Sequence, residues 1–130
     1  MDCPPALGPV TVNALAAADR VIVPVQAEYL ALEGLAEFRA TMSSVQRDLN
    51  PRLGLSGIVV TMHDERTRLA QDVERDLREH FGDDVYRNVI PRTVRLAEAP
   101  SYGIPVTDYA PASRGADAYV ALANEVVTRG

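Results

Sequence analysis

The sequence of 130 residues contains no lysine, because all thirteen of its basic residues are arginine. A nucleotide cradle of the type G-x-x-x-x-G-K-[S/T] needs a glycine-rich loop and a lysine that reaches the phosphates. The eight glycines are scattered along the chain, and no glycine-rich loop is present. These residues by themselves therefore cannot form a phosphate site of that kind.

Cysteine and long apolar runs are also scarce or missing. The single cysteine, Cys3, excludes an internal disulfide and a zinc site built from cysteines, which suits a reducing compartment. No apolar run approaches the roughly 20 residues of a membrane span, and the first residues do not have the pattern of a signal peptide. We therefore expect a cytoplasmic protein with no membrane segment.

The residues that are present have a globular composition. Hydrophobic residues make up 47% of the chain and charged residues 24%, which is typical of one folded domain of ordinary size. The net charge of −5 excludes a protein that binds nucleic acid through its overall charge. Any nucleic-acid binding must come from a local basic patch.

Short apolar runs that alternate with amphipathic segments predict an α/β fold. We expect strands at residues 20–25, 55–61 and 85–91, and the first of these, RVIVPV, has the continuous apolar character of a strand buried on both faces. Helices are expected at residues 11–18, 28–49, 67–81 and 113–127, and residues 92–111 form a long, proline-rich irregular segment. In the last helix we expect an inward stripe of Ala116, Tyr119, Val120, Ala123 and Val127. This order of elements predicts a parallel sheet with flanking helices, incomplete because strands that would precede residue 1 are missing.

Asp2 is the leading candidate for chemistry. It stands at an expected strand-to-helix corner, followed by Pro4, Pro5 and Gly8. A carboxylate at the carboxyl end of a strand can help to hold a magnesium ion beside phosphates. For a lone aspartate of this kind, a role in capping a helix or a turn is the simpler interpretation.

Other reactive residues show no catalytic pattern. His63 and His80 lie far apart in the sequence and have no ligand-spaced partners, so we expect surface or capping histidines. Cys3 is expected to be a small packing residue rather than a nucleophile.

Four arginines occupy two corners at the ends of neighbouring strands: Arg66, Arg68, Arg92 and Arg95. They could form a patch for phosphate or for a DNA backbone. Because Asp64, Glu65 and Glu98 lie among them, the residues alone favour a solvated rim of salt bridges.

The whole chain resembles the C-terminal half of the ParA/Soj family of chromosome- and plasmid-partitioning ATPases. The resemblance rests on four blocks: DCPPALG at 2–8 with NAL at 13–15, PVQAEYLALEGL at 24–35, IPRTVRLAEAPSYGIP at 90–105, and YAPASRGA at 109–116. The last two blocks separate this family from its MinD-like and nitrogenase-iron-protein-like relatives. The resemblance implies an incomplete P-loop NTPase domain of the deviant Walker A (SIMIBI) type, with residues 1–130 as its C-terminal part.

The resemblance also implies roles for single residues. Asp2 matches the Walker B aspartate, which helps to place magnesium and the attacking water, and residues 4–8 match the switch segment that senses the γ-phosphate. The family builds its adenine pocket at the positions of Thr61, Met62, Pro91 and Arg92. Arg66 and Arg95 match basic positions used for sequence-independent DNA binding. For these two arginines the resemblance therefore adds support to DNA binding relative to a rim of salt bridges.

The chain departs from the family at the nucleotide cradle, because the family's K-G-G-x-G-K-[S/T] loop is absent. The family uses ATP and Mg²⁺, but we expect these residues alone neither to bind ATP tightly nor to hydrolyse it. The implied partners are a ParB-type protein, weakly bound nonspecific DNA, and a second copy or a complementing N-terminal fragment. The implied location is the nucleoid. The alternatives are a non-enzymatic module that binds DNA or ParB, and a decayed relative of the family.

Overall fold

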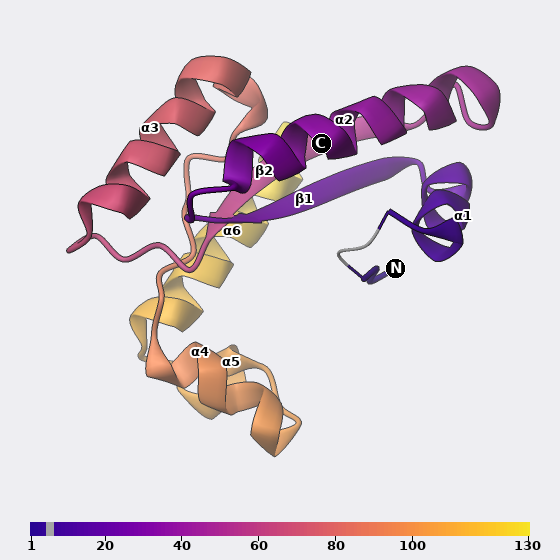
Figure 1. The fold of residues 1–130 in the computed structure, drawn as a ribbon. Helices are drawn as coiled ribbons and strands as arrows, with labels where there is room; N and C mark the ends of the chain where they lie inside the picture. Colours follow the sequence, from indigo (N-terminus) through magenta and orange to yellow (C-terminus); the bar gives the residue numbers. More distant parts are fainter. Residues whose placement is uncertain (5–6) are drawn as a thin grey trace.

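Two parallel strands, β1 (Arg20–Gln26) and β2 (Gly54–Thr61), form the sheet at the centre of the fold (Figure 1). The computed structural model describes residues 1–4 and 7–130. Helix α2 (Ala31–Asp48) connects the strands as a crossover, as parallel pairing requires. The α/β class, the parallel sheet and the first two predicted strands are confirmed.

The pairing of the two strands changes register near its start. Val21 pairs with Leu55, but the next residue, Ile22, pairs with Gly57, so Ser56 has no partner in β1. Leu55 packs on the side of α2, whereas a side chain at Gly57 would meet the ring of Tyr86 on the other side. The irregularity therefore lies where Tyr86, which also bonds Ser56 through its hydroxyl at 3.0 Å, approaches the strand.

The predicted third strand at 85–91 is wrong as a regular strand. The segment runs parallel to β2 beside its other edge, but it makes only two isolated bridges, Ile58 with Val85 and His63 with Pro91. Between the bridges the segment leaves the ladder and later returns to it. The order across the sheet is therefore β1, β2 and then an irregular extended segment.

Glu125 provides the physical reason for this irregularity. Its carboxylate accepts the backbone N–H groups of Arg87 at 2.7 Å and Asn88 at 3.0 Å. Because the Tyr86 N–H donates to Ile58 O of β2, the Asn88 N–H would be the next donor to face β2 in a regular strand, and Glu125 takes it. Burial acts to raise the pKa of Glu125, but these N–H donors act to lower it, and the net shift is downward. A charged side chain from a distant helix has replaced part of a strand ladder.

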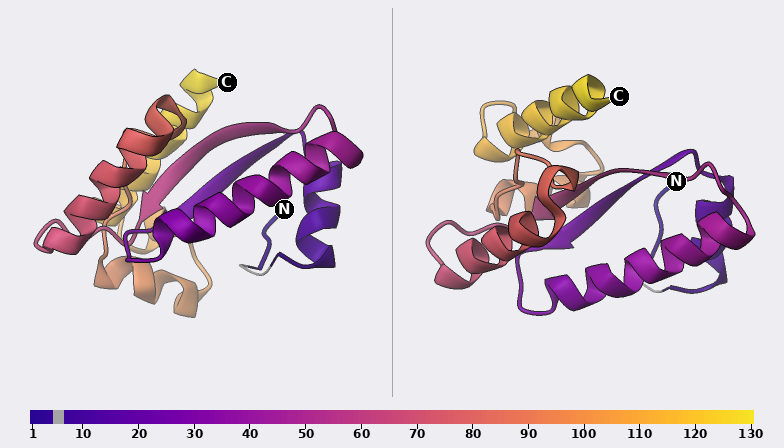
Figure 2. Two further views of the ribbon diagram at one scale, coloured as in Figure 1. Left: turned by 45° about the horizontal axis from the view of Figure 1, so that its top comes forward. Right: turned by 90° about the horizontal axis from the view of Figure 1, so that it is seen from above.

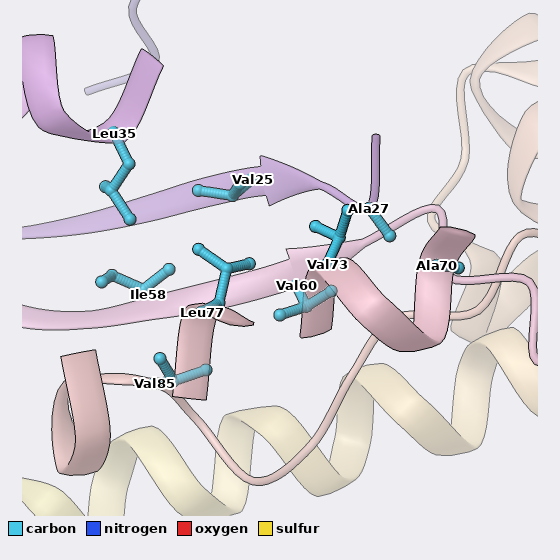
Figure 3. Packing of buried hydrophobic residues seen from close by; sticks show 9 residues of the cluster. All are labelled: Val25, Ala27, Leu35, Ile58, Val60, Ala70, Val73, Leu77 and Val85. Atoms are coloured by element: carbon cyan, nitrogen blue, oxygen red, sulfur yellow. The ribbon is translucent and has the colours of Figure 1, made fainter. Parts of the chain in front are cut away.

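Helices cover the two faces of the sheet unequally. Helices α2 and α3 (Arg68–Phe81) pack on one face, and α6 (Arg114–Arg129) lies on the other (Figure 2). Helix α1 (Pro9–Ala17) packs against the far end of α2 through Leu15, Met42 and Val45. The largest core cluster lies between β1, β2, α2 and α3 (Figure 3), and it comprises Val25, Ala27, Leu35, Ile58, Val60, Ala70, Val73, Leu77 and Val85.

Strand β1 is buried on one face, not on both as predicted. Val21, Val23 and Val25 face α2, whereas the alternate side chains are exposed, and Ile22 is 43% exposed. Helix α6 packs against Val59 of β2 and against segment 85–91 instead of β1. In the part of the chain that the structure describes, no strand pairs with the outer edge of β1.

The bounds of α6 are close to those predicted, but its inward face differs. Of the predicted stripe, Ala116 is buried, but Tyr119, Val120 and Val127 are exposed. The side chains that pack against Val59, Tyr86 and Ile90 are instead Ala118, Leu122 and Val126. The apolar residues on both sides of this helix made its true inward face ambiguous in the sequence.

Residues 92–111 are more regular than expected. They contain α4 (Val94–Glu98), the 3-10 helix η2 (Ala99–Tyr102) and α5 (Val106–Tyr109), and a further 3-10 turn, η1 (Gly82–Asp84), follows α3. Thr93 caps α4 by accepting the Leu96 N–H at 3.3 Å, and Pro105 precedes α5. Prolines therefore begin short helices here rather than prevent them.

Among the described residues, no helix combines the length and apolar character that crossing a bilayer demands.

Candidate functional site

A pocket of about 710 Å³ opens at the carboxyl ends of β1, β2 and segment 85–91. Ligands of open α/β sheets bind at this edge because loops and helix starts converge there. The pocket is lined by Gln26, Thr61, Met62, Asp64, Arg66, Ile90, Pro91, Arg92, Thr93, Val94, Leu96, Ala97 and Tyr119.

The structure brings together the four residues expected to form an adenine pocket. Thr61 and Met62 end β2, and Pro91 and Arg92 follow segment 85–91, yet all four line this pocket. The backbone of His63 joins the two corners, because its N–H donates to Ile90 O at 3.1 Å and its C=O accepts the Arg92 N–H at 3.0 Å. Two short stretches thirty residues apart therefore form one wall.

Met62 has a left-handed backbone, with φ at +52°, and among the described residues no other non-glycine residue has a positive φ. This backbone conformation is unfavourable for a residue with a long side chain. It commonly persists where surrounding contacts impose it. Here the backbone must turn sharply between the end of β2 and the bridge from His63 to Pro91. The Met62 side chain is thereby placed at the exposed mouth of the pocket.

His63 is buried beneath this wall, so the prediction of a surface or capping histidine is wrong for this residue, whereas His80 is exposed as predicted. Its side chain is 6% exposed, and its Nε2 lies 2.9 Å from Glu74 Oε2 of α3. The two atoms are close but not aligned for a hydrogen bond. Glu74 in turn pairs with Arg78, with 2.8 Å between Arg78 Nη2 and Glu74 Oε1. These contacts connect the pocket wall to α3.

Asp64 and Arg66 form a charged pair at the pocket mouth. Both nitrogens of the Arg66 fork, Nε and Nη2, lie 2.9 Å from the two carboxylate oxygens of Asp64. The Arg66 backbone N–H also donates to Asp64 Oδ1 at 3.1 Å. The side-chain bond from Arg66 is the main cause that lowers the pKa of Asp64 to about 2, and the nearby charge of Arg92 adds to it.

Arg95 lies on α4 and does not line the pocket. Its Nη1 donates to Glu98 Oε2 at 3.2 Å, and the Tyr109 hydroxyl donates to the same oxygen at 3.0 Å. The contact with Tyr109, followed by the charge of Glu98, raises the pKa of Arg95. Arg68 is exposed at the first turn of α3. The contacts of Arg66 and Arg95 match the salt-bridged rim that their acidic neighbours favoured.

Of the N-terminal candidate residues, Asp2, Pro4 and Gly8 do not line the pocket. Asp2 and Pro4 are exposed, and Gly8 caps the start of α1, with the N-terminus beside that helix (Figures 1 and 2). Pro5 lies outside the described residues. Within residues 1–4 and 7–130, no three or more His, Cys, Asp or Glu side chains gather in a way that could hold a metal ion. Cys3 is exposed, so its expected packing role is wrong.

Sequence reasoning missed three polar residues in the pocket lining: Gln26, Thr93 and Tyr119. Gln26 ends a strand, and that position alone could have identified it as a lining residue. Tyr119 belongs to a helix and carries no comparable signal. It reaches the pocket because α6 crosses the sheet beside segment 85–91.

Known sequences related to this chain cover almost all of it. It is 60% identical over 129 residues to the chromosome-partitioning ATPase Soj of Thermus thermophilus, with 99% of this chain and 52% of that protein aligned. It is 52% identical to the chromosome partitioning protein ParA of Caulobacter vibrioides, with 99% and 48% aligned. It is 51% identical to the sporulation initiation inhibitor protein Soj of Bacillus subtilis, with 100% and 51% aligned. The chain thus spans about half the length of these curated relatives.

A family profile described as an AAA domain matches residues 1–55. Among solved structures, cobyrinic acid a,c-diamide synthase from Mycobacterium smegmatis is 39% identical, with a TM-score of 0.73 over 95% of this chain and 43% of that chain. The same enzyme with bound ADP and magnesium aligns with a TM-score of 0.74, again over 95% of this chain and 43% of that chain, at 39% identity.

Proposed function

Because this chain belongs to the ParA/Soj family of partitioning ATPases and has part of a P-loop NTPase fold, we propose that it serves chromosome or plasmid segregation. In this proposal, residues 1–130 are the C-terminal part of a nucleotide-switched domain. The observation that carries the proposal is the pocket in which Thr61, Met62, Pro91 and Arg92 meet. These are the positions where the family resemblance places the adenine base.

The pocket residues have the chemistry that an adenine base requires. Pro91 and Met62 offer apolar surface to the flat ring, and Gln26 and Thr61 offer hydrogen-bonding groups at the strand ends. In our proposal these residues bind and orient the base and exclude water from one side of it. Bound ATP would supply the phosphoryl group whose cleavage switches the domain.

The triphosphate end of the site does not fit the described residues. Asp2, the candidate for placing magnesium, is exposed and lies outside the pocket lining. The 130 residues also contain no lysine and no glycine-rich loop to hold the phosphates. We therefore assign no hydrolytic step to these residues and propose that they do not hydrolyse ATP alone.

Nucleotide titrations test both halves of this proposal. Isothermal titration of the chain with Mg-ATP is expected to give no micromolar binding, because the phosphate contacts supply most of the affinity. Adenosine at millimolar concentration is expected to shift the NMR amide signals of Thr61 and Arg92 but not that of Gly34 on α2. Uridine is the control ligand. Equal shifts with uridine would refute the base pocket, and micromolar Mg-ATP binding would refute the incomplete site.

Three arrangements are compatible with this role. A separate N-terminal piece that carries a K-G-G-x-G-K segment could complete the domain, or the chain could act without ATP as a module that binds DNA and a ParB-type protein. It could also be a decayed relative. Coding sequence just upstream that encodes the lysine-containing loop would support the first arrangement, and a soluble, monomeric chain would speak against the third.

DNA binding through Arg66 and Arg95 is the second part of the proposal. Both arginines are exposed, and nonspecific DNA binding depends on such phosphate contacts. Replacing both with alanine is expected to weaken binding to duplex DNA and to reduce its salt slope by about 2, roughly one for each lost contact.

The matched control for this experiment is Arg75→Ala on α3, which removes one exposed arginine that is paired with Asp72. A gel shift that responds equally to Arg75→Ala and to each single substitution, Arg66→Ala or Arg95→Ala, would count against the proposed DNA surface.

A further inference from the structure

The two arginines of the proposed DNA surface share one local arrangement. Each is paired with a carboxylate of its own corner or helix, Arg66 with Asp64 and Arg95 with Glu98. Each carboxylate also accepts a second donor that does not belong to an arginine side chain. For Asp64 this donor is a backbone N–H at 3.1 Å, and for Glu98 it is the Tyr109 hydroxyl at 3.0 Å.

The second donor holds the carboxylate of each pair in place more firmly than the arginine side chain is held. The Asp64 side chain is 24% exposed and that of Arg66 is 89% exposed, and the corresponding values for Glu98 and Arg95 are 39% and 60%. The backbone of Asp64 is held as well, because its C=O accepts the Thr67 hydroxyl at 3.0 Å. The carboxylates are therefore fixed, whereas the guanidinium groups can move into solvent.

A fixed carboxylate competes with an incoming phosphate. To bind a DNA phosphate, Arg66 must give up its two bonds to Asp64, and Asp64 then remains nearby as a like charge that repels the phosphate. Glu98 has the same effect on Arg95. In a chain with a net charge of −5, these local acids oppose the attraction of Arg66 and Arg95 for a phosphate.

We infer that Asp64 and Glu98 are autoinhibitory residues that hold Arg66 and Arg95 away from DNA and thereby set a low resting affinity. The inference rests on the proposed DNA binding and deepens it. It gives Asp64 and Glu98 control over a site for a polyanion, a role beyond that of surface ion-pair partners.

Fluorescence anisotropy with a labelled duplex tests the inference in the full 130-residue chain. Asp64→Asn and Glu98→Gln are each expected to lower Kd about threefold to fivefold, the upper part of the range that one exposed ion pair can supply. The matched control is Asp72→Asn, which removes the same charge beside Arg75 on α3, where the two groups are 2.9 Å apart. Circular dichroism of each variant checks that the fold is retained.

The gain must also act through the paired arginine. Adding Arg66→Ala to Asp64→Asn is expected to abolish the gain, and a gain that survives would overturn the inference. A gain no larger than that of Asp72→Asn would overturn it too, because only net charge would then matter. If Kd responds to Arg66→Ala and Arg95→Ala but not to the carboxylate variants, the inference alone fails. If Kd responds to neither arginine, the proposed DNA surface fails as well.

Discussion

At the scale of single residues, Asp64 carries a charge that its surroundings hold firmly. Its pKa falls from an ordinary 3.8 to about 2, chiefly through the side-chain bond from Arg66. Because the folded protein binds this proton less readily than the unfolded chain, Asp64 stabilises the fold fully above its ordinary pKa. That contribution is lost as the pH falls toward the lower value.

We therefore expect the pH to change how much Asp64→Asn destabilises the protein. The difference in thermal midpoint between the parent and the variant should shrink between neutral pH and about pH 3. Arg66→Ala should raise the titration midpoint of the Asp64 carboxyl carbon in NMR. An equal difference at both pH values would show that the charge of Asp64 contributes no stability.

At the scale of residues, the sequence best predicted the positions of side chains that stand at the ends of strands. Thr61 and Met62 share one pocket with Pro91 and Arg92, and binding of adenine there stays a prediction of the resemblance. The burial of His63 could not be predicted, because it depends on where α3 places Glu74. The pairing of each acid with a particular arginine could not be predicted either, because it depends on side-chain geometry.

At the scale of secondary-structure elements, two glycines in similar sequence contexts have opposite roles. A Cβ at Gly57 of β2 would lie 2.5 Å from the Tyr86 ring, which is fully buried, whereas a Cβ at Gly34 of α2 would meet nothing within 4 Å. We expect Gly57→Ala to destabilise the protein by about 1–3 kcal/mol through overpacking. Gly34→Ala should stabilise it by about 0.5–1 kcal/mol, because alanine favours the helix.

Urea denaturation of the two variants measures both effects. The comparison is internally controlled, since each substitution adds the same methyl group. If Gly57→Ala were as stable as the parent, Tyr86 would have to move away from β2, and its 3.0 Å contact with Ser56 would be lost.

The elements also show what periodicity can and cannot establish. The ends of α2, α3 and α6 lie within a few residues of their predicted positions, because caps and breakers are local signals. The strand predicted at 85–91 was wrong because Glu125, more than thirty residues away, binds the Asn88 N–H that would otherwise face β2. The inward face of α6 was wrong because two apolar stripes compete on that helix.

At the scale of the whole molecule, β1 has an unpaired outer edge and one uncovered face among the described residues. Such an edge can pair with another chain, and exposed apolar side chains strengthen that tendency. We expect the protein to self-associate as its concentration rises, and Ile22→Lys to reduce this association by placing a charge on β1. Light scattering after size exclusion measures the mass.

Val127→Lys is the control, because Val127 is exposed and apolar but lies near the end of α6, away from β1. If both lysine variants lowered the association equally, general solubility rather than the strand edge would explain the result. The sequence predicted an incomplete sheet, but only the packing of α6 shows that β1 rather than β2 is left open.

The unpaired Ser56 decides which way the second half of β2 points its side chains. Before it, Leu55 faces the large cluster, and after it Ile58 and Val60 do so, although an unbroken two-residue alternation would send Leu55 and Gly57 to the same side. Deleting this one serine would place Leu55 directly before Gly57, so a simple alternation would keep Leu55, Ile58 and Val60 on the side of the large cluster. A regular ladder that kept the serine would instead turn Leu55 to the side of Gly57 and away from the large cluster.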